Sequence, residues 1–473
     1  MTEFLPYGVR TAPASAWRLN AAAAAITFAV VFLALIAPAL WNGYPLLQFD
    51  TGGYIARWYE GYLVPSRSTV YGQFLHAGER TGFWLNIVAQ TLATVFVLNL
   101  TLRTNGIARY TQRMIIVLVL CATTALPWLT SILLTDIFAG LAVLAVYLLA
   151  AHQAQLSRAE QAGLAGIIAA ATASHSATFA ILAGLAGCGW IVLPFLKSRL
   201  SSTGLAAASA SIALGVALLL VSNYALSGRM AWTPGGYGIA FGRMLEDGIV
   251  KRYLDDNCAR VQHQLCPHRA HLPATADEFL WSNSVFNRLG RFNGLGEEMR
   301  TIVLASLAQY PAAQVTTAAR ATVRQLAMVA SGYGIHNQLW HTYGIMERFV
   351  PSQTAPMRAA RQQRGDLDFT LLNRIHVPAA YLSIAALIAM LALAGYRRSL
   401  DGLALPAAVV MVTILGNAFV CGALSGPHDR YGSRIVWLAT FVVAIAIADW
   451  LLSAGKRQIP QGRRDRNAST PAL

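Results

Sequence analysis

Apolar residues along this chain gather in long uninterrupted runs instead of alternating with polar residues. A helix of about 20 such residues is long enough to cross the roughly 30 Å hydrocarbon core of a bilayer. The pattern therefore predicts an all-α polytopic membrane protein with about ten transmembrane helices. The expected spans are 18–42, 81–102, 114–134, 136–156, 161–175, 177–196, 203–226, 376–396, 402–424 and 434–454.

Composition supports the membrane assignment. The 473 residues are 56% hydrophobic and only 12% charged, which is too little charge to cover the surface of a soluble protein of this length. The net charge of +15 would suggest nucleic acid as the partner of a soluble protein. In a membrane protein, Lys and Arg in short loops instead fix the orientation, so we expect membrane lipid and no nucleic acid as partner.

The distribution of basic residues predicts the orientation. The short turns at Asp136 and His175 contain no Lys or Arg, whereas the loops on the other side are basic. Under the positive-inside rule both termini are then cytoplasmic, and we expect a multi-pass protein of the bacterial inner (plasma) membrane. The basic residues of the expected inside loops are Arg103, Arg109, Arg113, Arg158, Lys197, Arg199, Arg397 and Arg398.

Four regions follow from these spans. Residues 1–226 form an N-terminal transmembrane module that contains a first extracytoplasmic loop, 43–80. Residues 227–375 form a large extracytoplasmic loop region, 376–455 the C-terminal transmembrane helices, and 456–473 a basic cytoplasmic tail. The first loop and the large loop should together build an extracytoplasmic layer. Helices are expected in this layer because alternating patterns are scarce.

Two of the five cysteines fall in the large loop. Cys258 and Cys266 are candidates for a disulfide bond, since an oxidising compartment permits one. The alternative is a metal site that adds the neighbouring histidines, His263, His268 and His271. Their spacing fits no standard zinc pattern, so the disulfide is favoured and no metal site is expected here.

Two carboxylates are the candidate catalytic residues. Asp50 lies shortly after the first span, where it could act as general base on an acceptor hydroxyl or bind a divalent cation. An Asp before Thr-Gly-Gly is equally suited to capping a helix N-terminus. Asp136 lies at the next outside turn, where an ionisable residue near membrane depth favours a functional role, although it also suits a helix start.

A short segment before the last span carries further candidates. His428, Asp429, Arg430 and Arg434 combine forked, permanently charged donors with an imidazole and a carboxylate, which suits phosphate oxygens. The alternative is that the arginines only anchor the chain among lipid head groups. His175 could join this site, although a lone His at such an apex is more often structural.

Other candidate substrate contacts lie in the two large loops. Arg57 and Glu60 follow Asp50 in the first loop. His336 and Trp340 belong to the segment SGYGIHNQLWHTYG, which is rich in aromatic and imidazole side chains. Such a segment suits sugar recognition and equally suits a membrane interface, where Trp and Tyr are enriched.

The arrangement of these residues resembles the GT-C superfamily of integral-membrane glycosyltransferases. The resemblance lies in Asp50 in the first outside loop, Asp136 at the next outside turn, the many spans and the substantial outside region. It implies use of a polyprenyl-phosphate sugar, with Asp50 as catalytic base or metal-associated residue and Asp136 in a supporting acidic role. Unlike many members, this chain lacks a paired acidic motif in the first loop, and its large outside region precedes the last three spans.

The leading functional hypothesis is therefore transfer of a sugar from a polyprenyl-phosphate-linked donor to an envelope glycan, glycolipid or protein. The alternatives are a transporter or flippase for a lipid-linked or anionic solute, and a non-catalytic envelope-glycan assembly protein. A transporter would place functional charges inside the spans and show repeats related by symmetry. Few charges lie inside the expected spans, and no clear repeat is present.

Overall fold

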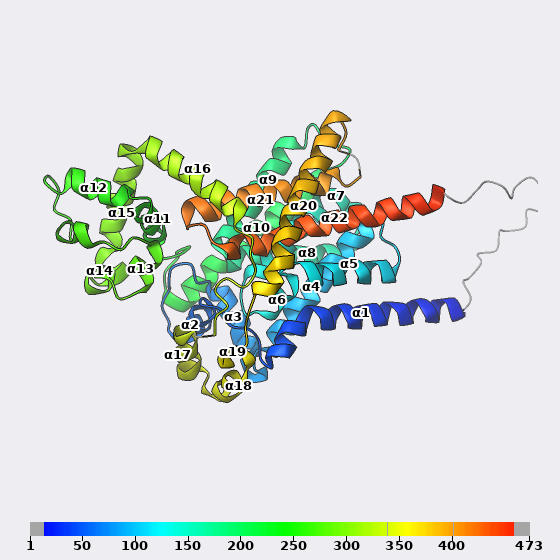
Figure 1. Ribbon diagram of the computed structural model, residues 1–473, viewed down its shortest axis with the longest axis horizontal. Helices are drawn as coiled ribbons and strands as arrows, with labels where there is room; N and C mark the ends of the chain where they lie inside the picture. The colour runs from blue at the N-terminus through cyan, green and yellow to red at the C-terminus, as the bar shows by residue number, and fades with distance from the viewer. Residues whose placement is uncertain (1–13, 338, 401, 458–473) are drawn as a thin grey trace, which may run out of the picture.

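The computed structural model describes residues 14–337, 339–400 and 402–457, and within these every regular element is a helix. The single pairing of β type is an isolated bridge between Leu46 and Ile132 among the described residues. A bundle of long helices forms the body of the molecule (Figure 1). Most of the expected basic tail, 456–473, lies outside the described residues.

Seven helices in the described part of the chain are long and apolar enough to cross a membrane. The fold class is therefore that of an all-α protein with membrane-spanning helices, while the expected number of ten spans is not confirmed. The seven are found within α1 (Ala14–Asn42), α4 (Trp84–Thr104), α7 (Asp136–His152 and the following turn), α10 (Ser202–Ser227), α20 (Thr370–Tyr396), α21 (Ala404–Leu424) and α22 (Asp429–Arg457).

The other three expected spans are shorter or broken. The expected span 114–134 is divided into α5 (Tyr110–Thr123) and α6 (Leu126–Ser131), because Thr124 is extended and Pro127 starts a new helix. The fifth and sixth are α8 (Arg158–Ser174) and α9 (Ser176–Val192), each with 17 residues. That length is at the lower limit of the roughly 17–25 residues with which helices cross a bilayer.

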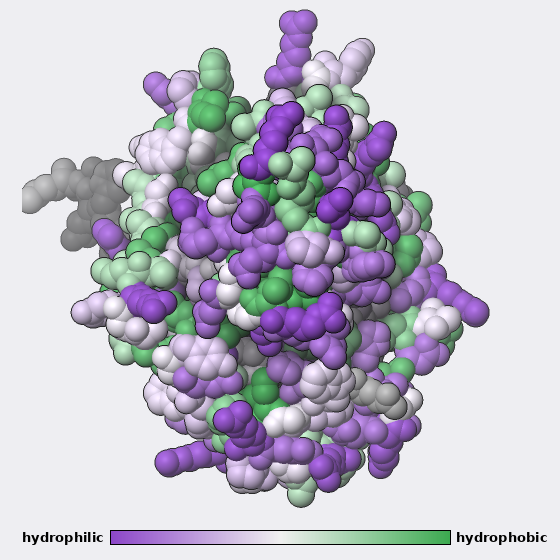
Figure 2. Space-filling model, turned by 90° about the vertical axis from the view of Figure 1, so that its left-hand side faces the viewer, coloured by the Kyte–Doolittle hydropathy of each residue, from purple (hydrophilic) through white to green (hydrophobic). Residues whose placement is uncertain are grey.

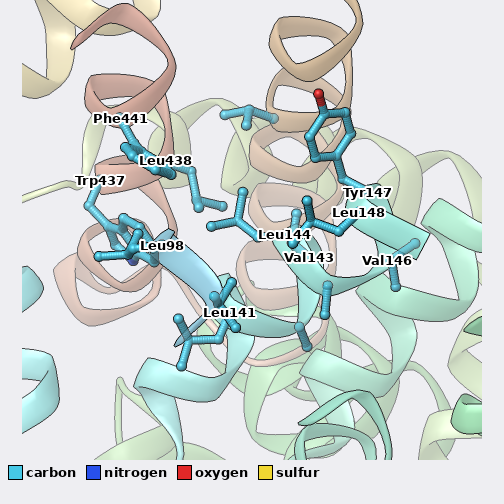
Figure 3. Packing of buried hydrophobic residues seen from close by; sticks show 14 of the residues in the cluster. Leu98, Leu141, Val143, Leu144, Val146, Tyr147, Leu148, Trp437, Leu438 and Phe441 are labelled. Carbon is cyan, nitrogen blue, oxygen red and sulfur yellow. The ribbon is translucent and has the colours of Figure 1, made fainter. Parts of the chain in front are cut away.

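The core of the bundle is built around α7. Its side chains Leu141 and Leu144 pack with Leu98 of α4 and with Trp437 and Phe441 of α22 (Figure 3). Nearly every residue of α7 is buried by neighbouring helices. The first residue of α7, Asp136, is therefore enclosed by protein and not by lipid.

A layer of shorter helices covers one end of the bundle, called the layer end below. In Figure 1 it lies to the left and below, while the N-terminal end of α1 and the C-terminal end of α22 point to the right. The helices of this layer are α2 (Thr51–Tyr59), α3 (Thr69–Gly78), α11 (Gly236–Glu246), α12 (Ile249–Asn257), α13 (Ala276–Trp281), α14 (Val285–Arg288), α15 (Arg291–Gln309), α16 (Pro311–Ala327), α17 (Trp340–Phe349), α18 (Thr354–Ala359) and α19 (Arg361–Arg364). Short 3₁₀ turns occupy Glu79–Thr81, Gln153–Gln155, Cys266–His271 and Pro351–Gln353.

The layer contains two separate cores. Helices α11 to α15 pack around their own apolar cluster, which includes Phe241, Phe279 and Met299. Helices α2 and α3 of the first loop instead share a core with α17 and α18, through residues such as Tyr54 and Met346. The large loop is thus split between an independent unit and a part that is fused to the first loop.

Helix α16 ties the layer to the bundle. It packs along α21, where Gly422 allows a close approach, since a β-carbon there would lie 2.8 Å from the Ala321 carbonyl oxygen. Within the α11–α15 unit, Cys258 and Cys266 form a disulfide bond. The end of the molecule covered by this layer is largely hydrophilic (Figure 2).

Candidate functional site

Five charged residues meet where the layer joins the bundle, and we call them the ionic cluster: Asp50, Arg67, Asp136, Arg430 and Arg434. Asp50 directly precedes α2, and Arg67 lies two residues before α3. Asp136 is the first residue of α7, and the two remaining arginines lie on α22. Segments from distant parts of the sequence therefore converge on one point.

Arg430 bridges the two carboxylates. Its Nη1 donates to Oδ2 of Asp50 at 2.6 Å, and its Nε donates to Oδ2 of Asp136 at 2.6 Å. Its Nη2 donates to the other oxygen of Asp136 at 3.1 Å. The pair with Asp136 is therefore bidentate, the geometry in which Arg binds carboxylate most strongly. Because the side chains of Arg430 and Asp136 are only 10% and 2% exposed, water screens this pair little.

Asp50 occupies the N-cap position of α2 without capping it. Its backbone is in the α-helical region, and its side chain makes no capping hydrogen bond. One carboxylate oxygen instead accepts from Arg67 and the other from Arg430. The sequence left Asp50 as either a functional carboxylate or a helix cap. The capping interpretation is wrong for its side chain, which points into the ionic cluster.

Arg434 is completely buried and is held from several sides. Its Nε and Nη2 donate to Oδ1 of Asn417 on α21, at 3.3 and 3.0 Å. Its Nη1 lies 3.6 Å from Oδ1 of Asp136 and donates to Nδ1 of His175 at 3.4 Å. The turn between α8 and α9 thereby joins the ionic cluster through His175.

The start of α22 explains why both arginines reach the ionic cluster. The last span was expected to begin at residue 434, with a turn before it, but α22 begins at Asp429. Arg430 and Arg434 are therefore four residues apart on one helix and lie on the same face. Asp429 faces away, where its carboxylate accepts from the backbone N–H of Ala330 at 2.9 Å. Asp429 is thus not brought into the ionic cluster.

The ionic cluster carries a net positive charge, because three guanidinium groups face two carboxylates. Buried charges are stable only when they are paired, so the excess cation favours an anion as an additional partner. Arginine offers forked donors that match the oxygens of a phosphate. The cluster is therefore a candidate site for a phosphate group.

The space beside the ionic cluster is small. A cavity of about 20 Å³ is lined by Arg67 and His175 together with Trp232 and Asn223. A cavity of this size holds about one water molecule. A ligand larger than a water molecule therefore fits this cavity only if the side chains that line it move.

Asp50 is ionised at neutral pH in this environment. Burial alone would raise the pKa of its carboxyl group, but the charges of Arg67 and Arg430 outweigh burial and lower the pKa from 3.8 to about 2. A carboxylate with so low a pKa is a weak base while both guanidinium groups hold it. Its basicity would rise once another anion took over one of these two partners.

A pH dependence of stability follows from this shift. Since the pKa of Asp50 is lower in the folded than in the unfolded protein, its charge stabilises the fold above about pH 4 and stops doing so as the pH falls towards about 2. The shift corresponds to roughly 2 kcal/mol. We expect Asp50→Asn to flatten the loss of thermal stability below about pH 4, measured by unfolding in detergent. Parallel curves for the variant and the wild type would contradict this assignment.

The remaining candidates lie outside the ionic cluster. Arg57 is buried and pairs with Glu60, while its Nε donates to the Gly53 carbonyl at 3.0 Å, so this pair closes the end of α2. The ring of His428 stacks on Tyr333 with centroids 4.9 Å apart, next to the cluster but without an ion pair to it.

The aromatic candidates form part of the rim. His336 lies against Phe49, the residue before Asp50, with ring centroids 5.1 Å apart. Trp340 starts α17 and is 78% exposed. Helix α17 packs directly on α2, and Thr342 of α17 donates to the carbonyl oxygens of Gln48 and Phe49, just before α2. The structure therefore places these rings near Asp50, on an accessible surface.

No metal site can be assigned in the described residues. No group of three or more His, Cys, Asp or Glu side chains there is arranged to hold a metal ion. Both oxygens of Asp50 accept from guanidinium groups, so the divalent cation considered from the sequence finds no open ligand there in this arrangement.

Two residues of the site, Arg67 and Asn417, are not among the candidates that the sequence predicts. For Asn417 a signal existed, since an amide inside an apolar helix needs a partner. For Arg67 no pattern in the sequence distinguished it from Arg57, because only the fold decides which of them reaches Asp50.

The fold and the site together define an all-α protein with helices long enough to span a membrane and a buried ionic cluster at the layer end. In comparisons with family models, curated proteins and solved structures, the chain matches none of them. The geometry of the site is therefore the basis for assigning a function.

Proposed function

We propose that this protein is a membrane glycosyltransferase that moves a sugar from a polyprenyl-phosphate-linked donor to an envelope glycan, glycolipid or protein on the extracytoplasmic face. The observation that carries the proposal is the ionic cluster. It combines surplus guanidinium charge with a carboxylate, Asp50, at the end of the helix bundle. A lipid phosphate held at the membrane surface would meet such a cluster without leaving the bilayer.

In the proposed reaction the donor phosphate takes over guanidinium donors from Asp50. Arg67 and Arg430 are the two groups that hold Asp50 and also the two that suit phosphate oxygens. As the phosphate binds, the positive charge that Asp50 experiences is partly neutralised, and its pKa rises towards the usual value. Donor binding would thus convert Asp50 from an ion-pair partner into a general base.

The transfer step is then a single displacement. Asp50 accepts the proton of an acceptor hydroxyl, and the hydroxyl oxygen forms a bond to the anomeric carbon of the sugar. The bond between that carbon and the phosphate oxygen breaks, and the polyprenyl phosphate leaves with the electron pair. Arg430 and Arg67 stabilise the charge that develops on the leaving phosphate. One displacement at the anomeric carbon inverts its configuration.

Asp136 and Arg434 would act as positioning residues. Asp136 holds two nitrogens of Arg430, and Arg434 is fixed by Asn417. This arrangement orients the Arg430 fork towards Asp50 before substrate binds. Such preorganisation spares the reaction the cost of arranging charges in the transition state.

The proposed sidedness rests on two features. The disulfide between Cys258 and Cys266 lies in the layer, and disulfides persist in extracytoplasmic compartments. The N-terminal end of α1 and the C-terminal end of α22 point away from the layer (Figure 1). This direction is in keeping with cytoplasmic termini under the positive-inside rule. The proposed location is therefore the bacterial inner membrane, with the layer outside.

The acceptor would approach from the layer end. Trp340 and Phe49 expose aromatic faces near Asp50, at 78% and 48% exposure. Such faces stack on the apolar face of a sugar ring, and the neighbouring His336 supplies a polar group. The proposal assigns the acceptor glycan to this rim and the donor phosphate to the ionic cluster.

Binding of a polyprenyl phosphate tests the proposal. We expect the purified protein in nanodiscs to bind undecaprenyl phosphate, and Arg67→Gln to weaken binding at least about tenfold, because a charge-assisted pair is worth roughly 1.5–3 kcal/mol. The matched control is Arg103→Gln. This arginine is also paired with a carboxylate, Glu160. It lies at the C-terminal end of α4, whereas the layer helix α3 precedes the N-terminal end of α4. Equal binding by the wild type and Arg67→Gln would overturn the phosphate assignment.

A further inference from the structure

Part of the connection between α16 and α17 passes beside the ionic cluster, and we call this part, residues 328–336, the strap. It leaves α16 at Met328, whose backbone is extended, and it contains no helix. Gly332 and Gly334 have φ angles of 95° and 78°, in the left-handed region that glycine adopts without strain. The strap is therefore a bent piece of chain between two helices of the layer.

The strap contacts both segments that carry the ion pair between Asp50 and α22. Tyr333 stacks on His428, the residue before α22, with ring centroids 4.9 Å apart. The next residue of the strap, Gly334, accepts a hydrogen bond at 3.3 Å from the backbone N–H of Phe49, which directly precedes Asp50. The strap therefore bridges the same two segments as the ion pair, and it holds them together.

Two residues of α20 hold the strap at Ser331. The side-chain oxygen of Asn373 accepts from the Ser331 N–H at 2.8 Å, and the side-chain nitrogen of Asn373 donates to the Ser331 carbonyl oxygen at 3.0 Å. About one turn further along α20, Nδ1 of His376 lies 2.8 Å from the Ser331 hydroxyl. We call these three contacts the latch. The neighbouring Ala330 N–H is held by Asp429 of α22.

The latch is not optimised for stability. Nε2 of His376 is buried without a hydrogen-bond partner in the described structure, and such a group destabilises the state that buries it. Water would reach this nitrogen once Ser331 moved away, so opening the latch returns part of its cost. The apolar anchorage is also small, because Val329 packs with Ala380 and Val436 in a small cluster of its own. Segments with few buried apolar contacts open at a low cost in free energy.

A lipid phosphate between Arg67 and Arg430 would have to displace Asp50. Both oxygens of Asp50 accept from these arginines, and the cavity beside Arg67 holds about one water molecule. A phosphate that replaces Asp50 therefore needs the segment before α2 to move away from α22. Because the strap is bonded to both segments, it resists this movement while the latch is closed.

We infer that the strap is an autoinhibitory brace that holds the ionic cluster closed until Ser331 is released from α20. The inference rests on the proposed function and adds the regulation of its site. If only molecules with an open strap bind the lipid, the apparent affinity is the intrinsic affinity reduced by the open fraction. A variant with a weaker latch therefore binds the lipid more tightly than the wild type does. Loss of a residue that only supports the fold would not tighten binding.

The variant Asn373→Ala tests this inference. Alanine removes two hydrogen bonds of the latch, and the position is partly exposed on a helix, so the fold should tolerate it. We expect the affinity for undecaprenyl phosphate, measured in nanodiscs, to rise at least about tenfold. The matched control is Asn257→Ala in α12, whose side chain donates to the Tyr253 carbonyl at 2.8 Å, and it should leave the affinity unchanged. Asn373→Ser is a milder variant for use if Asn373→Ala folds poorly.

Hydrogen exchange measured by mass spectrometry reports on the strap itself. Peptides that cover 328–336 should exchange faster in Asn373→Ala than in the wild type, and faster in the wild type when the lipid is bound. If the wild type bound the lipid and Asn373→Ala bound it equally or more weakly, the inference would be overturned. Strap peptides whose exchange the bound lipid leaves unchanged or slows would also overturn it. If neither protein bound the lipid, the proposed function would be wrong, and the brace would have no ligand to exclude.

Discussion

Replacing Arg430 by alanine is expected to lower the free energy of unfolding by roughly 3–5 kcal/mol, the cost of removing one partner from a buried ion pair. Arg430 holds both Asp50 and Asp136, and the Asp136 side chain is only 2% exposed. Without Arg430, Asp136 keeps only the longer contact to Arg434 at 3.6 Å. An almost fully buried carboxylate would then lack its main counter-charge. Unfolding in detergent, followed by circular dichroism, measures the effect.

A matched control separates this effect from loss of an ordinary surface arginine. Arg358 is paired with Glu347, but its side chain is 65% exposed, so Arg358→Ala should change stability by less than about 0.5 kcal/mol. Adding Asp136→Asn to Arg430→Ala should recover part of the lost stability, because it removes the uncompensated charge. An Arg430→Ala protein that unfolds at the wild-type midpoint would contradict the proposed importance of the bridge.

Replacing Asp50 by asparagine is expected to lower the rate of sugar transfer about 10²–10⁴-fold, the usual contribution of general base catalysis. The amide has nearly the same shape and still accepts a hydrogen bond from Arg67 or Arg430, so the fold should persist. It cannot take a proton from an acceptor hydroxyl. Membranes containing the variant, supplied with radiolabelled polyprenyl-phosphate sugar, would report the rate per amount of folded protein.

The matched control for this experiment is Asp255→Asn. Asp255 is an aspartate of the layer that is 49% exposed and lies 3.4 Å from Arg269, away from the ionic cluster. Its replacement should leave the rate unchanged. If the Asp50→Asn variant transferred sugar at the wild-type rate, with normal protein levels, the assignment of Asp50 as the general base would be wrong.

The long apolar helices were predictable because bilayer thickness imposes a length on them that is visible in the sequence. Seven of the expected spans correspond to such helices in the described residues. The sequence does not predict the division of the span 114–134 into α5 and α6, although the span contains Pro127. Proline is tolerated in membrane helices, and its effect on a helix depends on the neighbouring helices. The expected fifth and sixth spans, α8 and α9, have only 17 residues each, and how they lie in a bilayer depends on tilt, which packing decides.

The candidate site was predictable as a set of residues on one side but not as a set of pairs. Asp50, Asp136 and the pair Arg430 and Arg434 could be placed at the ends of three spans, since topology alone brings such ends to one membrane face. Which arginine meets which carboxylate depends on tertiary packing. Helix α22 begins one turn earlier than expected, and this start separates Arg430 from Asp429.

The most direct test of the central claim is a cryo-electron microscopy map of the protein in nanodiscs with bound undecaprenyl phosphate. We predict phosphate density between Arg67 and Arg430, with Asp50 released from at least one of these arginines. The acceptor side should open towards Phe49 and Trp340 at the layer end. Phosphate density elsewhere, with the Asp50–Arg430 pair intact, would contradict the account, as would a pathway that crosses the whole bilayer.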